Sequence, residues 1–264
     1  MWTRALLKQN GMIAFKRNYW ACVGVTMIAA FLGGSMAGGG LNFNYNVNNG
    51  SAGSADLPYN GGAMVPGSNL FTEGLPMYFF LVLAIAALVG TIIGLAVSIL
   101  VSNVVMVGCN RYFLENREHK TNVSQVFYGF QDGRYSPTVW VMFLRTLYVF
   151  GWSLLFLIPG IIKSYSYMMV PYILAEDVYM DRKRVFELSS QMMYGHKMEA
   201  FVLSLSFIGW HLLGALTFGM VDIFYTNPYI NATFAEFYSA LKAEALQKGI
   251  LHQGELPGVG TVEE

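Results

Sequence analysis

Two long intervals without a formal charge constrain the fold of this chain more than any other feature of its sequence. No Asp, Glu, Lys or Arg occurs between Arg17 and Asp56, and none occurs between Glu73 and Arg111. A helix that crosses a hydrocarbon core about 30 Å thick needs roughly 20 consecutive apolar residues. Each interval can hold one such helix, and we expect these helices at residues 19–37 and 76–107.

Composition extends this prediction to the whole chain. Hydrophobic residues make up 55% of the sequence and charged residues only 12%, about half the charged share of a typical soluble domain. Four further apolar segments follow, at 138–157, 158–174, 200–221 and 224–241. The sequence therefore predicts an all-α fold, a polytopic transmembrane helix bundle of about six spans.

The positions of the basic residues predict the orientation of these spans, because Lys and Arg in short loops collect on the cytoplasmic side. With six spans, all four basic clusters face the cytosol. They are Arg4, Lys8, Lys16 and Arg17; Arg111, Arg117, Lys120 and Arg134; Arg182, Lys183, Arg184 and Lys197; and Lys242 and Lys248. We expect a multi-pass protein of a bacterial cytoplasmic membrane with both termini in the cytosol.

The domain organisation follows from the same pattern. Residues 1–248 form a single six-helix membrane domain, in which 41–75 is a flexible extracytoplasmic loop without Lys or Arg, and 249–264 form a disordered cytoplasmic tail. The small residues Ser35-Met36-Ala37 also fit a cleaved signal peptide, which remains an alternative for the first span. The 16 basic and 16 acidic residues leave no net charge to attract nucleic acid.

Short amphipathic helices are expected on the cytoplasmic face of the membrane. One follows Asn122, which has the spacing of a capping box, and another follows Asp181, a candidate N-cap. Their apolar stripes comprise Val123, Val126, Phe127 and Phe130 in the first, and Val185, Phe186, Leu188, Met192 and Met193 in the second. Arg182, Lys183 and Arg184 beside the second stripe predict contact with anionic lipid, although simple anchoring to the bilayer explains them as well.

Small residues recur at every fourth position of the second predicted span. They are Ala86, Gly90, Gly94, Ser98 and Ser102, and they form one ridge on a helix. Such a ridge allows another helix to approach closely. We expect a neighbour from the same chain, while a helix of a second molecule remains the alternative.

Ionisable residues inside predicted spans are the main candidates for function, because an unpaired charge in the bilayer is costly. These are Arg145, Lys163, Asp222 and Glu236. Lys163 can reach the outer interface and Asp222 can meet water there. Arg145 and Glu236 lie at similar predicted depths, so we expect them to pair.

Helix-breaking residues cluster in the same half of the chain. They are Pro159, Gly160, Pro171, Asn227 and Pro228. Such breaks line cavities in transporters. Alternatively, Pro159-Gly160 forms a tight turn between spans and Pro228 stands in the first turn of a helix.

A search for catalytic patterns gives no candidate. The four histidines, His119, His196, His211 and His252, form no His-x-x-x-His pair, and the sequence has no Cys-x-x-Cys, no Gly-x-Ser-x-Gly and no phosphate-binding Gly-Lys-Ser/Thr loop. We therefore expect no cofactor, no metal and no enzymatic activity.

Four segments of the later half resemble a known family. They are FLENRE (113–118), WSLLFLIPGIIKSYSY (152–167), PYILAE (171–176) and NPY (227–229). They are similar to the domain-of-unknown-function 975 family of bacterial integral membrane proteins, and the layout more distantly resembles the six-helix membrane domain attached to some glycerophosphodiester phosphodiesterases. The resemblance implies a membrane location and supplies no catalytic residue. The long loop at 41–75 departs from the family pattern.

Three functions remain open at this point. The first is a non-enzymatic accessory or scaffold protein of the cell envelope, with the lipid bilayer as a partner and its protein partners unknown. The second is a small-solute transporter or channel, for which Arg145, Glu236 and the helix breaks are the features. The third is an intramembrane enzyme, which requires a His or Ser to converge with Glu236 or Asp222 at a cleft.

Overall fold

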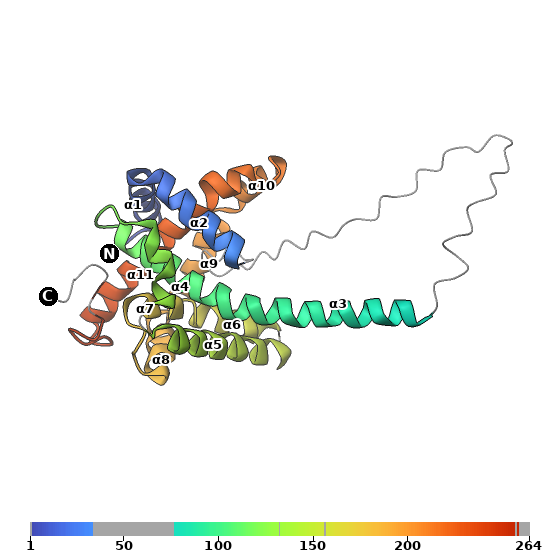
Figure 1. Ribbon diagram of the computed structural model, residues 1–264. Helices are drawn as coiled ribbons and strands as arrows, with labels where there is room; N and C mark the ends of the chain where they lie inside the picture. The colour runs from blue at the N-terminus through green and yellow to red at the C-terminus, as the bar shows by residue number, and fades with distance from the viewer. Residues whose placement is uncertain (1, 34–76, 132, 156, 257, 259–264) are drawn as a thin grey trace. The chain divides into compact units, whose positions relative to one another are not determined.

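Helices are the only regular elements in the part of the chain that the structure describes. The computed structural model describes residues 2–33, 77–131, 133–155, 157–256 and 258. The α-helices are α1 (Arg4–Arg17), α2 (Tyr19–Gly33), α3 (Met77–Val97), α4 (Asn103–Asn116), α5 (Tyr135–Leu155), α6 (Leu157–Ser166), α7 (Val170–Glu176), α8 (Arg182–Met192), α9 (Lys197–Leu205), α10 (Ile208–Leu216) and α11 (Asn227–Gln247) (Figure 1). The predicted all-α class is confirmed.

Three short elements of other helical types complete the fold. The π-helical turns η1 (Ser98–Ser102) and η3 (Asp222–Thr226) precede α4 and α11, and the 3₁₀-helix η2 (Val123–Phe130) follows α4. The chain divides into two compact units, residues 1–43 with 98–264, and residues 44–97. The described part of the second unit is α3, which has 21 residues and no charged side chain. The predicted loop at 41–75 lies outside the described residues.

The described residues contain two helices that are long and apolar enough to cross a membrane. They are α5 and the run Lys197–Leu216, which comprises α9 and α10; two shorter apolar helices are Tyr19–Leu32 and Tyr78–Thr91. The predicted bundle of six spans is therefore not confirmed.

The predicted fourth span, 158–174, is divided into two short helices. A turn at Tyr167–Met169 separates α6 from α7, and α6 with 10 residues is only about 15 Å long. Pro171 stands in the first turn of α7, where its missing N–H costs no helical hydrogen bond. All seven residues of α7 are buried, so this part of the segment belongs to the protein core.

The core of the larger unit is centred on α11, the predicted sixth span. Thirteen of its 21 residues are buried, and the polar N-terminal helix α1 packs along it. Gly11 of α1 makes this approach possible, because a Cβ there would lie 2.8 Å from the Cα of Thr233. The aromatic ring of Trp2 meets Phe237 edge to face, and its Nε1 donates to Glu244 at 3.4 Å. The N-terminus therefore lies against the C-terminal half of α11.

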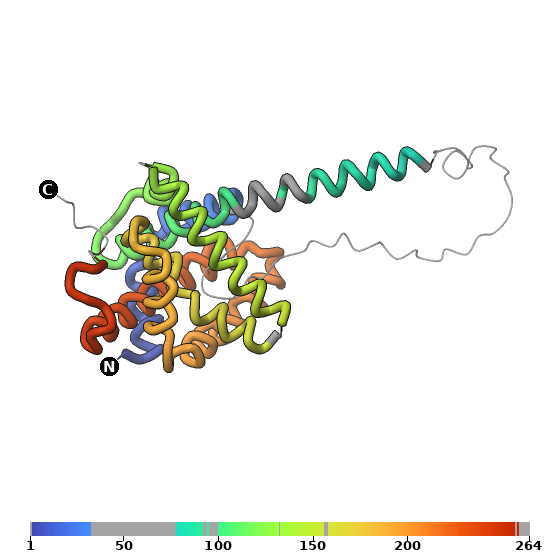
Figure 2. Tube along the Cα trace, turned by 90° about the horizontal axis from the view of Figure 1, so that it is seen from below, coloured from blue at the N-terminus to red at the C-terminus, as the bar shows by residue number. Residues whose placement is uncertain are grey.

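Two helical hairpins extend from this core (Figure 2). In the first, α5 packs against α6, and Gly160 allows the close approach because a Cβ there would lie 2.7 Å from the Cα of Ser153. In the second, α10 is followed by a tight turn into η3, in which Gly219 N–H donates to Gly214 O at 2.7 Å and Phe218 adopts a φ of 53°. Phe218 is fully exposed at the tip.

The two predicted amphipathic helices have different outcomes. Asp181 caps α8, accepting hydrogen bonds from the backbone N–H groups of Lys183 and Arg184, as predicted. The segment after Asn122 is a 3₁₀-helix, and Asn122 makes no capping hydrogen bond with its side chain. Its stripe is also divided: Val126 is buried against α4, where Gly108 has no room for a Cβ, whereas Phe127 and Phe130 are exposed.

The prediction of a disordered tail at 249–264 is wrong for its first part. Leu251 and Leu256 are buried, and Glu255 pairs with Arg184 of α8 at 2.5 Å. Two buried leucines and one ion pair hold residues 250–256 on the protein. Residues 257 and 259–264 lie outside the described part.

Candidate functional site

Ion pairs concentrate where α4, α7 and α11 meet. Arg117 Nε lies 3.0 Å from Glu236 Oε1, Arg111 Nε lies 3.2 Å from Glu115 Oε1, and Lys242 pairs with Glu176. The carboxylates of Glu115 and Glu176 are nearly inaccessible to solvent. Buried charges of this kind are tolerated because each has an opposite partner. We call these three pairs the charged base.

The predicted pair of Arg145 and Glu236 is wrong. Glu236 binds Arg117, while the Nε of Arg145 donates to the backbone oxygen of Tyr167 at 3.0 Å. The prediction compared depths along two helices that were both assumed to cross the bilayer. In the structure, α11 is a core helix that packs against α1 and α4. Glu236 therefore meets Arg117, the residue that follows α4.

The other two predicted ionisable residues also have partners. Lys163 lies over the rings of Trp152 and Tyr167, at 5.3 and 5.6 Å from their centroids. Asp222 is buried, in contrast to the predicted contact with water, and its Oδ1 lies 3.0 Å from His211 Nδ1. A Cβ at Gly214 would lie 2.1 Å from Asp222 Oδ2, so only glycine at this position leaves room for the carboxylate beside α10.

The predicted helix breakers begin helices in this structure. Pro228 stands in the first turn of α11, as one of the predicted alternatives required, and Asn227 is buried beside it. Pro159 and Gly160 lie in the first turn of α6 and not in a turn between two spans, since α6 begins at Leu157.

The ridge of small residues is divided between two elements. Ala86, Gly90 and Gly94 lie on α3, whereas Ser98 and Ser102 are the first and last residues of η1. The helical neighbour of this ridge stays a prediction.

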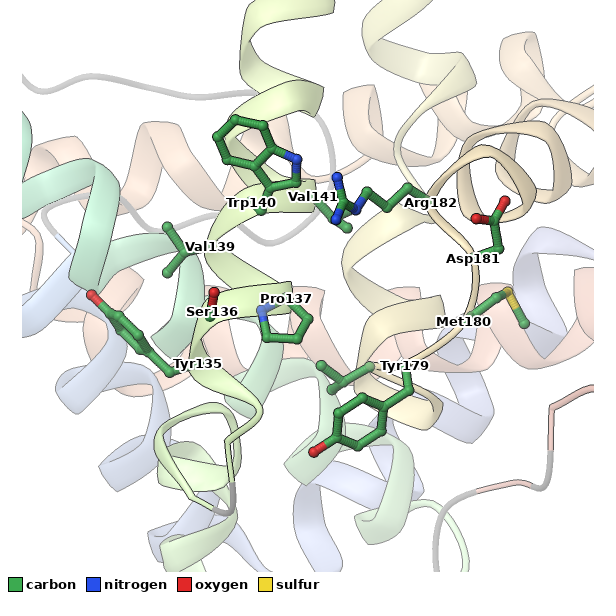
Figure 3. Close-up of a pocket in the computed structure, with 11 residues that line it drawn as sticks. Tyr135, Ser136, Pro137, Val139, Trp140, Val141, Tyr179, Met180, Asp181 and Arg182 are labelled. Carbon is green, nitrogen blue, oxygen red and sulfur yellow. The ribbon is translucent and has the colours of Figure 1, made fainter.

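An open pocket lies between the first turns of α5 and the segment that leads into α8. Its volume is about 710 Å³, and its lining includes Tyr135, Ser136, Trp140, Tyr179 and Arg182. Figure 3 shows the Arg182 side chain extending from the start of α8 toward the indole of Trp140 on α5, the helix that also carries Ser136 and Pro137. The guanidinium Cζ lies 5.9 Å from the ring centroid of Trp140.

The three predicted lipid-contacting cations separate in the structure. Arg182 lines the pocket, and Lys183 is exposed beside it. Arg184 turns toward the C-terminal segment, where Nη2 donates to Ile250 O at 2.8 Å and to Glu255 Oε2 at 3.0 Å. The hydrogen bonds from Arg184 lower the pKa of Glu255 to about 2. Arg184 therefore holds the chain end, and Arg182 is the member of the trio that can receive a ligand in the pocket.

Two features of the site were missed by reasoning from the sequence. The partners His211 and Asp222 are separated by 11 residues, and only the turn at Phe218 brings them together. The pairing of Arg117 with Glu236 joins residues 119 positions apart, so no local spacing could indicate it. Among the described residues, no group of three or more His, Cys, Asp or Glu side chains is placed to hold a metal.

Comparison with known families gives a match to the later half of the chain. A sequence model of the family described as "Protein of unknown function (DUF975)" matches residues 154–245, which include α6 to α10 and most of α11. The chain is similar to this family over these residues, and the predicted resemblance is confirmed there. No curated protein and no solved structure matches the chain.

Proposed function

We propose that this protein is a non-enzymatic, multi-pass protein of a bacterial cytoplasmic membrane that serves as an accessory or scaffold of the cell envelope. Its hairpin α5–α6 and the hairpin formed by α9–α10 and the chain that returns through η3 enter the bilayer, and the charged base and both termini remain in the cytosol. The observation that carries the proposal is the exposed apolar surface of these hairpins.

The hairpins expose large apolar side chains without any intervening formal charge. Residues 146–162 and 200–221 contain no Asp, Glu, Lys or Arg. At the tips, Leu154 is 76% exposed, Leu216 is 79% exposed and Phe218 is fully exposed. Contiguous apolar surfaces of this kind are rare on soluble monomers and are expected on lipid-facing helices.

The ion pairs support a scaffold in preference to a transport pathway. A transported ion or proton requires ionisable groups that exchange partners along an accessible path. Glu236 instead binds Arg117, and Glu176 binds Lys242, between helices of the core. The energetic role of these pairs is to hold α4, α7 and α11 together.

Site-directed labelling of intact cells tests the location and the topology. In a variant without its two native cysteines, we expect a membrane-impermeant thiol reagent to label Asn46→Cys, and to label Lys183→Cys only after the cells are opened. Both variants should remain in the membrane fraction after alkaline extraction. Labelling of Lys183→Cys but not Asn46→Cys in intact cells would overturn the orientation, and release by alkali would overturn the membrane location.

Small-solute transport is the second candidate function, and one observation favours it. The buried Asp222 and the partly exposed His211 pair where the π-helical turn η3 interrupts the regular helix before α11. π-helical turns are frequent at functional sites. The test is solute flux into liposomes that contain the parent, Asp222→Asn or Glu236→Gln. Flux identical to that of empty vesicles across a broad panel excludes transport, whereas flux that Asp222→Asn abolishes would replace the scaffold proposal.

A further inference from the structure

The pocket beside Arg182 combines one cation with an apolar wall. Arg182 supplies the guanidinium, Ser136 supplies a hydroxyl, and Trp140, Val139 and Val141 supply apolar surface. A guanidinium presents a planar set of N–H donors that matches two phosphate oxygens at once. The pocket therefore offers a phosphate group a donor at its edge and a hydrophobic neighbour.

The acidic residue in the lining is already engaged. Asp181 Oδ2 accepts hydrogen bonds from the backbone N–H of Lys183 at 3.1 Å and of Arg184 at 3.3 Å. These bonds cap α8 and leave less negative charge facing the pocket. Lys183, which is exposed on the first turn of α8, adds positive charge nearby. The electrostatic balance of this surface thus favours an anion.

An apolar stripe begins at the pocket and continues along α5. Its exposed members follow one another at intervals of three and four residues, so they share one helix face. They are Trp140, Phe143, Leu147, Phe150 and Leu154. From the first to the last member the stripe extends about 21 Å along the helix axis. The ligand that matches both parts has an acidic head and long hydrocarbon chains.

We propose that this pocket binds the headgroup of an anionic glycerophospholipid of the inner leaflet. The phosphate accepts hydrogen bonds from Arg182, the indole of Trp140 lies at the level of the glycerol, and the acyl chains follow the stripe on α5. Tryptophan is enriched at this depth of a membrane. This inference rests on the proposed membrane location of the hairpins and assigns to them one specific lipid site.

Lipid titration of the full chain tests the site. The purified, delipidated protein in detergent is titrated with phosphatidylglycerol or with phosphatidylcholine of the same acyl chains, and bound lipid is counted by native mass spectrometry. We expect phosphatidylglycerol to bind more tightly. Arg182→Gln should weaken its binding about tenfold, as expected for loss of hydrogen bonds from a charged group. Lys183→Gln removes the same charge one residue further along, outside the pocket lining, and should change binding less than about twofold.

Specific outcomes overturn the inference. Equal losses from Arg182→Gln and Lys183→Gln would indicate a diffuse electrostatic attraction, and equal binding of phosphatidylcholine would remove the role of headgroup charge. Competition by inorganic phosphate as strong as that by the whole lipid would exclude the acyl-chain stripe. Because Arg182 is exposed, its substitution should leave the thermal unfolding midpoint unchanged. A chain that stays in the membrane fraction but shows none of these lipid effects contradicts this inference alone, whereas release of the chain by alkali contradicts the proposed function.

Discussion

The charged base and the hairpin α5–α6 differ in where they place their apolar side chains. In the base, α4, α7 and α11 bury apolar residues such as Phe234, and each charge has a partner, in two of the three pairs from another helix. In the hairpin, the apolar residues are exposed, and the helices contact each other through the small residues Ser153 and Gly160. The difference indicates that the base folds as a protein core in water does, whereas the hairpin needs another apolar phase to cover it.

The largest expected effect is the loss of stability when one large apolar side chain is truncated in each of the two regions. Phe234→Ala in α11 removes a fully buried ring and should lower the free energy of unfolding by about 3–5 kcal/mol. Leu154→Ala at the tip of the hairpin should change it by less than about 0.5 kcal/mol. Denaturant unfolding of both variants in detergent measures the difference. Equal losses would show that the tip is packed as tightly as the base.

Glycine substitutions sharpen the comparison, because the sign of the effect should differ between the regions. In α4, a Cβ at Gly108 would lie 2.0 Å from the carbonyl oxygen of Val126, so Gly108→Ala should destabilise by about 1–3 kcal/mol through forced backbone movement. In α5, a Cβ at Gly151 would meet no atom within 4 Å, and Gly151→Ala should stabilise by about 0.5–1 kcal/mol through helix propensity. Thermal unfolding resolves the two signs. A stabilising Gly108→Ala would contradict the close packing of η2 on α4.

Removing one partner of an ion pair tests whether the base depends on its charges. Glu236→Gln leaves the partly buried Arg117 without its counter-charge and should cost about 1–3 kcal/mol. The matched control is Lys248→Gln, which removes an exposed i, i+4 partner of Glu244 and should cost about 0.3–0.5 kcal/mol. Adding Arg117→Met to Glu236→Gln completes a double-mutant cycle, and a coupling energy near zero would argue against a stabilising role for the pair.

The smallest expected effect concerns acid stability at the chain end. Hydrogen bonds from Arg184 lower the pKa of Glu255 from 4.5 to about 2 in the folded protein. A carboxylate with a lowered pKa contributes stability above its unfolded pKa, and this contribution is lost as the pH falls from about 4.5 to about 2. Glu255→Gln should therefore flatten the fall of the unfolding midpoint in this range. The control Glu118→Gln removes an exposed carboxylate elsewhere on the protein. If it flattens the fall of the unfolding midpoint as much as Glu255→Gln does, Glu255 makes no specific contribution to acid stability.

Reasoning from the sequence located most helices but could not assign their surroundings. The charge-free interval after Arg17 indicated α2, and the apolar run from Thr138 indicated α5 to within three residues at its start. The same reasoning treated 224–241 as a span, although α11 is covered by α1 and α4. The spacing of apolar residues predicts that a helix face avoids water, but it does not predict whether lipid or protein covers that face.

The candidate site likewise has features that the sequence could predict and features that it could not. Asp181 as a helix cap could be read from local spacing, because capping depends on backbone groups within one turn. The different roles of Arg182 and Arg184 could not be predicted in this way. They depend on the C-terminal segment, which packs against α8 so that Glu255 pairs with Arg184.

The sequence by itself determined that this protein is helical, rich in apolar residues and segregated in charge, because these properties follow from composition and from residue order over a few helical turns. Only the tertiary structure decided which charges meet, as Arg117 and Glu236 do, and which helix becomes the core. Such contacts join residues far apart in the chain, and their free energy depends on burial and distance, which exist only once the helices have packed.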